Sequence, residues 1–190
     1  MSLMKQLRSK ITADGDLEVS LSEVEMPVPE GNRLIVRMEA APINPSDMGP
    51  LFGPANMAEA RLENESGTLI LKAKVPAERL AVLAPRLDKE MPVGNEGAGV
   101  VIDAGPDPSA QALMGKTVAV LNGRAYAQYC NVPADKCLVL NEGTTPKQAA
   151  SCFVNPLTAL GMVETMKHEN HTGLVHTAAA SNLGQMLNRI

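Results

Sequence analysis

Short apolar runs, each closed by glycine or proline, fill the first ~130 residues and restrict the chain to a fold built from short strands. Leu17 to Leu21 alternates between apolar and polar side chains, as a half-buried strand does. The turn cluster 27–32 separates this run from a second one, Arg33 to Ala40. Further strands are predicted at 69–73, 97–104, 116–121, 127–132 and 137–140. Strands at these intervals predict a small, irregular β-barrel or sandwich.

The pattern changes after Glu142. A helix is predicted over 144–150, because Thr144 or Thr145 can cap it and Pro146 suits its first position. A longer helix is predicted over 157–166 from apolar residues spaced in threes and fours. A strand over 172–178, a turn of small residues and a helix from Asn182 follow, which is the opening of a parallel βαβ unit.

The predicted fold is therefore mainly β, an irregular barrel, followed by the start of an α/β domain. We expect the first domain to span residues 1–150 and the second to begin at 151 and to be incomplete at Ile190. Segment 54–90 is predicted to be an insertion in the first domain that carries one short strand and one short helix. One βαβ opening cannot bury itself, so we expect these residues to be a fragment of a longer protein, without turnover on their own.

Composition excludes several classes of function. A net charge of −4 does not favour binding to the nucleic-acid backbone or to anionic lipid. Aromatic residues make up 2% of the chain, which argues against base-stacking platforms. There is no apolar run of ~18 residues, so no membrane span is expected. Cys130, Cys137 and Cys152 form an odd set without zinc-site spacing and indicate reduced, cytoplasmic thiols that serve as small apolar residues.

Four stretches, in order along the chain, together resemble the medium-chain dehydrogenase/reductase superfamily. The first is similar to its Asn-Pro-x-Asp motif, the second to its Gly-His-Glu-x-x-Gly signature, the third to its entry into the cofactor domain and the fourth to its phosphate turn. In this sequence they read APINPSD (41–47), PVGNEGAGVV (92–101), VNPLTA (154–159) and VHTAAASNLG (175–184). The resemblance is to the zinc-independent branch of quinone oxidoreductases and enoyl reductases.

The resemblance implies a GroES-like catalytic domain followed by a Rossmann domain that binds NADPH in preference to NADH. It implies that Asn44, Asp47, Asn155 and Thr158 lie near the nicotinamide and the substrate, with Asn44, Asp47 and Thr158 as the catalytic candidates. The candidates for holding the cofactor are Asn155 and Thr158 together with the phosphate turn, Ala179, Ala180, Ser181, Asn182, Leu183 and Gly184. Small residues there allow close approach to a pyrophosphate. The alternative interpretation of residues 44–47 is a turn or a helix cap, and both interpretations can hold together.

The resemblance also predicts an enzyme without zinc. Zinc-dependent relatives place metal ligands where this chain has Asn44, Asn95 and Val154. Amides and valine cannot replace thiolate and imidazole ligands at a tetrahedral site. Without a metal to polarise a carbonyl, hydride transfer to a conjugated acceptor becomes the expected reaction.

Other side chains with reactive groups have plainer interpretations. Glu96 is expected to be structural, because a buried carboxylate needs partners. Enoyl reductases of this branch carry a catalytic tyrosine soon after the Asn-Pro-x-Asp motif, whereas Tyr126 and Tyr129 of this chain come far downstream. The proton donor is therefore left open. His168 and His171 are expected at the surface, and His176 as a structural residue.

The sequence thus predicts a cytoplasmic NAD(P)H-dependent reductase of a quinone or an α,β-unsaturated carbonyl. Its partner would be a small-molecule electron acceptor, with no nucleic acid and no membrane, and the full-length form would be a homodimer. The competing hypothesis is a truncated, non-catalytic module that binds a partner or dimerises without turnover.

Overall fold

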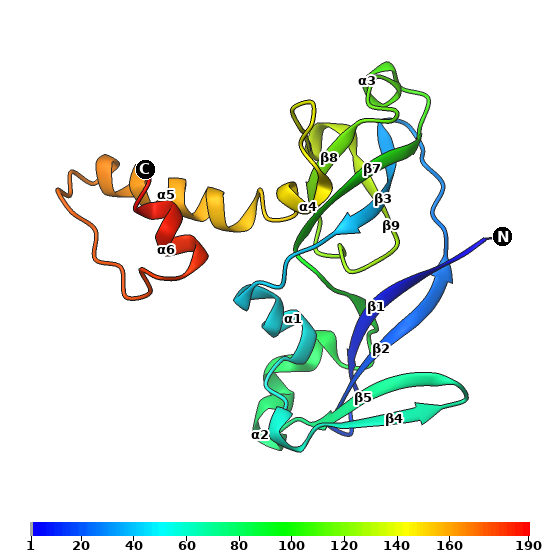
Figure 1. Cartoon of the computed structure of the whole chain (residues 1–190). Coiled ribbons are helices and arrows are strands. Elements are labelled where there is room, and N and C mark those ends of the chain that lie inside the picture. Colours follow the sequence, from blue (N-terminus) through cyan, green and yellow to red (C-terminus); the bar gives the residue numbers. More distant parts are fainter. Residues whose placement is uncertain (1) are drawn as a thin grey trace.

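The computed structural model describes residues 2–190 and contains two five-stranded antiparallel sheets (Figure 1). The first sheet has the spatial order β4 (Arg61–Glu65), β5 (Thr68–Lys74), β2 (Asp16–Glu25), β1 (Leu3–Ile11) and β6 (Met91–Pro92). The second has the order β10 (Cys137–Val139), β8 (Thr117–Leu121), β7 (Glu96–Ala104), β3 (Arg33–Ala40) and β9 (Tyr129–Pro133). The two sheets curl around a shared interior and form the predicted irregular barrel.

Helices in the first 150 residues are short. They are η1 (Pro45–Asp47), α1 (Met48–Phe52), η2 (Met57–Glu59), α2 (Ala77–Leu80), η3 (Ala81–Arg86), α3 (Pro108–Gln111), η4 (Ala134–Lys136) and α4 (Pro146–Ala149). A longer helix, α5 (Val154–His168), and the short α6 (Asn182–Leu187) follow. The chain therefore changes from strands to helices where the sequence pattern changes.

The alternation of apolar residues produces the core of the second sheet. Leu34 and Val36 of β3 are fully buried beside Val118 and Val120 of β8. Cys130 of β9 belongs to the same cluster, so this thiol fills space in the core as expected. Burial raises the pKa of Cys130, which keeps the thiol protonated and unreactive.

Strand β1 is the longest strand that the sequence pattern does not predict. Its inward positions include Gln6 and Ser9, which are 7% and 0% exposed. A strand is recognised in a sequence when apolar and polar residues alternate, and polar residues at buried positions interrupt this alternation. The Ser9 hydroxyl is satisfied by donating to the Leu51 carbonyl at 2.7 Å and by accepting from Arg86 at 2.8 Å.

Segment 54–90 differs from its prediction in one respect. It carries two strands, because the polar stretch before residue 68 forms β4 and pairs with β5 in a hairpin. The hairpin extends the first sheet through β2. Residues 77–86 are helical, but α2 is followed by 3₁₀ turns around Pro85.

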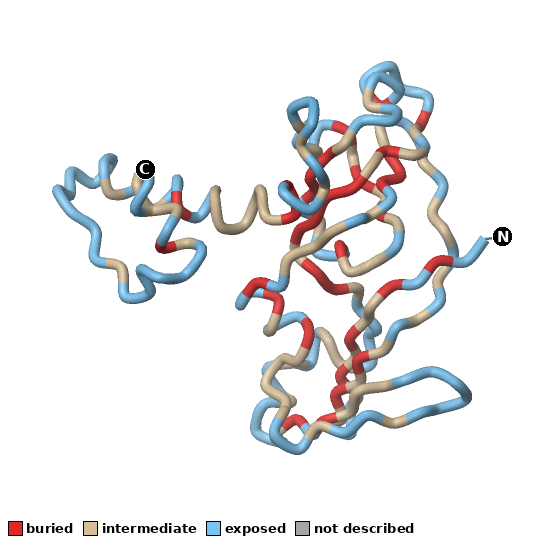
Figure 2. The backbone as a smooth tube through the Cα atoms, viewed as in Figure 1, coloured by how far each residue is buried: buried red, intermediate tan, exposed pale blue. Residues whose placement is uncertain are grey.

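The C-terminal region confirms the three predicted helices as α4, α5 and α6, and it corrects one predicted strand. Thr145 caps α4 in a reciprocal arrangement with Gln148, and Pro146 occupies its first position. Residues 172–178, predicted as a strand, form none. A parallel strand needs a neighbour for its backbone hydrogen bonds, and no strand among residues 2–190 pairs with this segment. Figure 2 shows that buried residues concentrate in the barrel, whereas α5, α6 and the connection between them are mostly exposed.

Candidate active site

The Asn44–Asp47 turn follows β3 by three residues, and the residues at its two ends are buried, with Asn44 4% and Asp47 1% exposed. Asp47 closes the turn, since its Oδ2 accepts from the Asn44 backbone N–H at 2.8 Å. Its Oδ1 accepts from the Asn95 backbone N–H at 2.8 Å, so the carboxylate also joins the turn to the second motif. The capping role considered for this motif is therefore present.

Glu96 is the second buried carboxylate, 1% exposed. Its Oε1 accepts from the Asn44 side-chain amide at 2.9 Å. Its Oε2 accepts from the backbone N–H groups of Phe153 and Val154 at 2.8 and 3.1 Å. A negative charge at the first turn of α5 also interacts favourably with the helix dipole. Glu96 thus connects three of the four motifs, in the structural role expected of it.

The three positions that correspond to zinc ligands in the zinc-dependent relatives make other contacts. Asn44 donates to Glu96, and Asn95 donates its side-chain amide to the Ser46 hydroxyl at 3.0 Å. Val154 contributes its backbone N–H to Glu96. Among residues 2–190, no three His, Cys, Asp or Glu side chains gather in a way that could hold a metal ion. Zinc independence stays a prediction that rests on the residue types.

Tyr126 is a site residue that sequence reasoning missed. It follows Pro42 by 84 residues, yet its hydroxyl donates to the Pro42 carbonyl at 2.8 Å beside the Asn44–Asp47 turn. Burial raises the pKa of its phenol, and the charges of Asp47 and Glu96 raise it further. The phenol therefore stays protonated and is a hydrogen-bond donor at neutral pH. Backbone hydrogen bonds bring Tyr126 here: its N–H donates to the Val93 carbonyl at 3.1 Å, and its carbonyl accepts from the Leu7 N–H at 2.8 Å. The sequence shows no signal for these long-range contacts.

Gly94 makes room for the tyrosine. Its backbone has φ +96°, and a Cβ at this position would lie 2.6 Å from the Tyr126 ring. Only glycine combines this conformation with this contact. Gly94 of the second motif is thus explained by Tyr126, about 30 positions downstream. The ring packs so closely against the backbone at residue 94 that no side chain fits between them.

Asn155 and Thr158 lie near the start of α5, next to the end that Glu96 holds. The Thr158 hydroxyl donates to the Val154 carbonyl of its own helix at 2.6 Å. The structure therefore brings Asn44 and Asp47 together and places Asn155 in the segment joined to them through Glu96. It shows no contact between Thr158 and that pair.

The phosphate-turn residues form an exposed turn that leads into α6. The Ser181 hydroxyl accepts from the Gly184 backbone N–H at 3.1 Å and donates to the Ala178 carbonyl at 2.7 Å. Gly184 is buried, and a Cβ there would lie 2.5 Å from the carbonyl oxygens of Ala178 and Ala179. Gly184 therefore packs against the turn itself. The small residues and the tight turn fit the close approach of a pyrophosphate.

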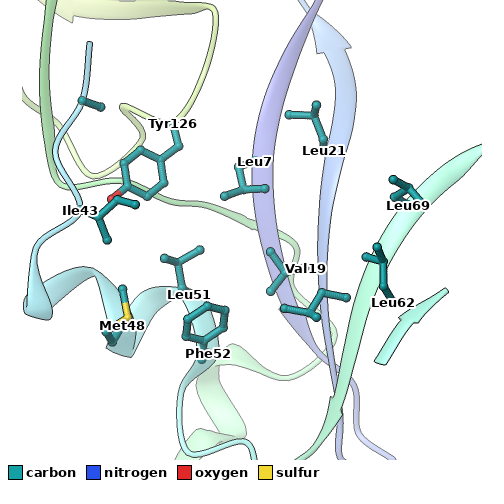
Figure 3. A pocket seen from close by; sticks show the side chains of 12 residues that line it. Leu7, Val19, Leu21, Ile43, Met48, Leu51, Phe52, Leu62, Leu69 and Tyr126 are labelled. Carbon is teal, nitrogen blue, oxygen red and sulfur yellow. The ribbon is translucent and has the colours of Figure 1, made fainter. Parts of the chain in front are cut away.

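An apolar cleft of about 780 Å³ opens beside the Asn44–Asp47 turn (Figure 3). Ile43 and Met48, which flank the turn in sequence, line one side together with Tyr126. Leu62 and Leu69 of the β4–β5 hairpin line the other. The volume is within the ~300–1,000 Å³ range of small-molecule sites.

The remaining histidines and cysteines lie away from this cleft. His168 and His171 are exposed, and His171 pairs with Glu169 at 3.1 Å. Burial raises the pKa of Cys137 to about 11, and burial and the charge of Glu96 raise the pKa of Cys152. None of the three thiols has the lowered pKa of a nucleophile.

Solved structures share this fold. A provisionally named NADPH:quinone reductase from Mesorhizobium loti has 25% identity and a TM-score of 0.67 over 98% of this chain and 51% of that one. A mycobacterial protein solved as a complex with NADPH has 20% identity and a TM-score of 0.60, covering 98% and 48%. The CurK enoyl reductase has 15% identity and a TM-score of 0.63, covering 97% and 49%. No family profile and no curated protein matches the sequence.

These neighbours confirm the fold class: a GroES-like barrel followed by part of a Rossmann-like domain. They also confirm the resemblance to the zinc-independent branch of the medium-chain dehydrogenase/reductase superfamily, whose quinone reductases and enoyl reductases they represent. The chain spans about half the length of these solved structures. No helix among residues 2–190 has the length and apolarity needed to cross a membrane.

Proposed function

We propose that the whole protein is a zinc-independent, NADPH-dependent reductase of a quinone or an α,β-unsaturated carbonyl. The observation that carries this proposal is the match of 98% of the chain to the Mesorhizobium loti structure, at 25% identity. The motif residues support it, because Asn44, Asp47 and Glu96 form one hydrogen-bonded network beside an apolar cleft. The same network, extended to Phe153 and Val154, ties the barrel to α5, which leads toward the predicted phosphate turn.

In this proposal the turn 179–184 holds the pyrophosphate, and Asn155 and Thr158 lie toward the nicotinamide ring. NADPH supplies a hydride when it is bound. The acceptor gains that hydride, which carries two electrons, and one proton, so a quinone becomes a hydroquinone. Asn44 and Asp47 shape the acceptor's side of the site, and the protein orients the acceptor and excludes water.

Tyr126 is the side chain beside the turn that is best suited to hydrogen-bond the acceptor's oxygen. Its hydroxyl keeps its proton at neutral pH, and its present acceptor is a backbone carbonyl. A hydrogen bond to the developing oxyanion would stabilise the charge that hydride transfer creates. The whole protein is proposed to be a cytoplasmic homodimer. No observation among residues 2–190 favours the non-catalytic alternative.

The test uses the full-length protein, NADPH and two acceptor classes. We expect saturable NADPH oxidation with 1,4-benzoquinone or with a simple enone. Absence of nucleotide binding together with absence of turnover in both classes would overturn the proposal.

A further inference from the structure

The apolar cleft beside the Asn44–Asp47 turn is larger than a bare quinone ring requires, and its far side consists of leucines. Leu62 and Leu69 of the β4–β5 hairpin are 65% and 56% exposed, so little of the protein covers them. On the near side Ile43 is 78% exposed. Figure 3 shows these side chains around one space, with Tyr126 and Ile43 on one side and the hairpin leucines on the other.

The hairpin presents two chemically different faces. Leu62, Leu69 and Leu71 alternate along β4 and β5 toward the cleft. The opposite face is charged, and there Lys72 pairs with Glu63 at 3.4 Å and with Glu18 at 3.8 Å. These ion pairs keep the charged face in water. Because successive side chains of a strand point to opposite faces, the leucines then face the cleft.

We propose that this cleft binds an extended apolar substituent of the electron acceptor, such as the alkyl or isoprenoid chain of a substituted quinone. The inference rests on the proposed function. Ile43 immediately precedes Asn44 and Met48 immediately follows Asp47, so the cleft begins at the candidate active site and leads away from it. Of the side chains lining the cleft, only that of Tyr126 carries a polar atom, which suits a ligand with its oxygen at one end and hydrocarbon beyond it.

A concave, apolar site favours a small molecule over a flat protein surface. Each methylene that leaves water on binding raises affinity up to about fourfold. A ten-carbon substituent that fills only part of the cleft is therefore expected to lower KM by at least about tenfold relative to an unsubstituted quinone.

The experiment compares 1,4-benzoquinone with 2-decyl-1,4-benzoquinone in the full-length protein with NADPH. We expect the decyl compound to have a kcat/KM at least about tenfold higher. The Leu69→Asn variant is expected to abolish most of this preference, because it places an amide among the leucines. The matched control is Thr68→Asn, at the neighbouring exposed position on the other face of β5, which is expected to keep the preference. Equal kcat/KM for the two quinones, or a preference unchanged by Leu69→Asn, would overturn the inference.

A second measurement separates this inference from the proposed function. Calorimetric titration with 1-decyl-2,5-dimethoxybenzene, which cannot accept a hydride, tests the cleft without turnover. We expect binding that Leu69→Asn weakens at least about tenfold and Thr68→Asn does not. If neither a quinone nor an enone is reduced and no nucleotide binds, the proposed function fails, and this titration still tests whether the cleft binds an alkyl chain. Absence of binding, or a dimer in solution that Leu69→Asn disrupts, would assign the leucines to another occupant and overturn the inference.

Discussion

At the residue scale, the candidate site depends on two buried carboxylates with different partners. Asp47 accepts from the backbone of Asn44 and Asn95, and Glu96 accepts from the Asn44 side chain and from the start of α5. Both receive hydrogen bonds from donors that are buried or partly buried. Removing such an acceptor costs more than an average hydrogen bond, because the donors lose their only compensation for leaving water.

Glu96→Gln tests this role. The variant keeps one acceptor oxygen but turns an amide N–H group toward the donors of residue 44 or of residues 153 and 154. We expect a loss of about 2–3 kcal/mol in the free energy of unfolding and faster amide exchange at Phe153 and Val154. Urea unfolding and hydrogen exchange measure the two effects. Glu142→Gln, at an exposed position, is the control, and an equal loss in both variants would contradict the role assigned to Glu96.

Gly94→Ala tests the contact with Tyr126. A methyl group would strain the backbone at φ +96° and collide with the tyrosine ring. Gly123→Ala is matched to it, because Gly123 has φ +69° but nothing within 4 Å of an added Cβ. We expect about 1–2 kcal/mol of destabilisation for Gly123→Ala and clearly more for Gly94→Ala, measured as urea midpoints. Similar losses of stability in the two variants would show that the contact between the added methyl group and the Tyr126 ring is relieved without cost.

The raised pKa of Tyr126 predicts a pH dependence of stability. The folded protein holds this proton at pH values where the unfolded chain, with a tyrosine pKa of about 10, releases it. Stability is therefore expected to fall as pH rises above about 10, and Tyr126→Phe is expected to reduce that slope. The difference in tyrosinate absorbance between the parent protein and the variant should titrate above pH 10. A difference titration at or below the ordinary pKa would contradict the buried environment of Tyr126.

At the element scale, Arg86 fastens the helical segment after β5 to α1. Its guanidinium donates to the carbonyls of Gly49 and Pro50 at 3.3 and 2.7 Å and to the Ser9 hydroxyl at 2.8 Å. Helix α1 carries Met48, Leu51 and Phe52 into the cleft, so this clamp fixes one side of it. The positive charge is partly buried, which lowers the pKa of Arg86.

Arg86→Met keeps the apolar stem but removes the donors. We expect a loss of about 1–3 kcal/mol and faster amide exchange across residues 49–53, since the α1 carbonyls lose their partner. Arg79→Met, at an exposed position on α2, controls for the loss of a positive charge. Unchanged amide exchange in α1 of the Arg86→Met variant would mean that other contacts hold this helix in place.

Local pattern predicted the elements that bury alternating apolar residues, and it missed those whose stability depends on distant partners. β3 was predicted at its observed bounds, Arg33–Ala40, because its alternation is uninterrupted. β1 was missed because Gln6 and Ser9 occupy buried positions. The predicted strand 172–178 is absent, since a sequence run alone does not supply a pairing neighbour.

The candidate site shows the same division. Asn44, Asp47 and Glu96 could be singled out from the motifs, and the structure joins them directly. Tyr126 could not, because its position depends on backbone hydrogen bonds with Leu7 of β1 and with Val93, and on the conformation of Gly94. Long-range strand pairing is not encoded in any short window of sequence, so residues that it brings together stay invisible to motif reasoning.

At the scale of the whole molecule, the chain combines a barrel that buries its own core with a helical region that buries little. The fully buried side chains of Leu34, Val36 and Val101 lie in the barrel. In α5 and α6 the buried residues are Ala159 and Gly184. Glu96 links the two parts at the first turn of α5. In the proposed reaction the acceptor therefore binds on the barrel and the cofactor binds beyond it.

The central claim is that the whole protein reduces a conjugated acceptor with NADPH and without zinc. The most direct test is NADPH oxidation by the full-length protein with 1,4-benzoquinone, measured beside the zinc content of the same sample before and after chelation. We expect saturable turnover that is unchanged when zinc is removed. Turnover that rises and falls with the zinc content, or none with any quinone or enone, would contradict it.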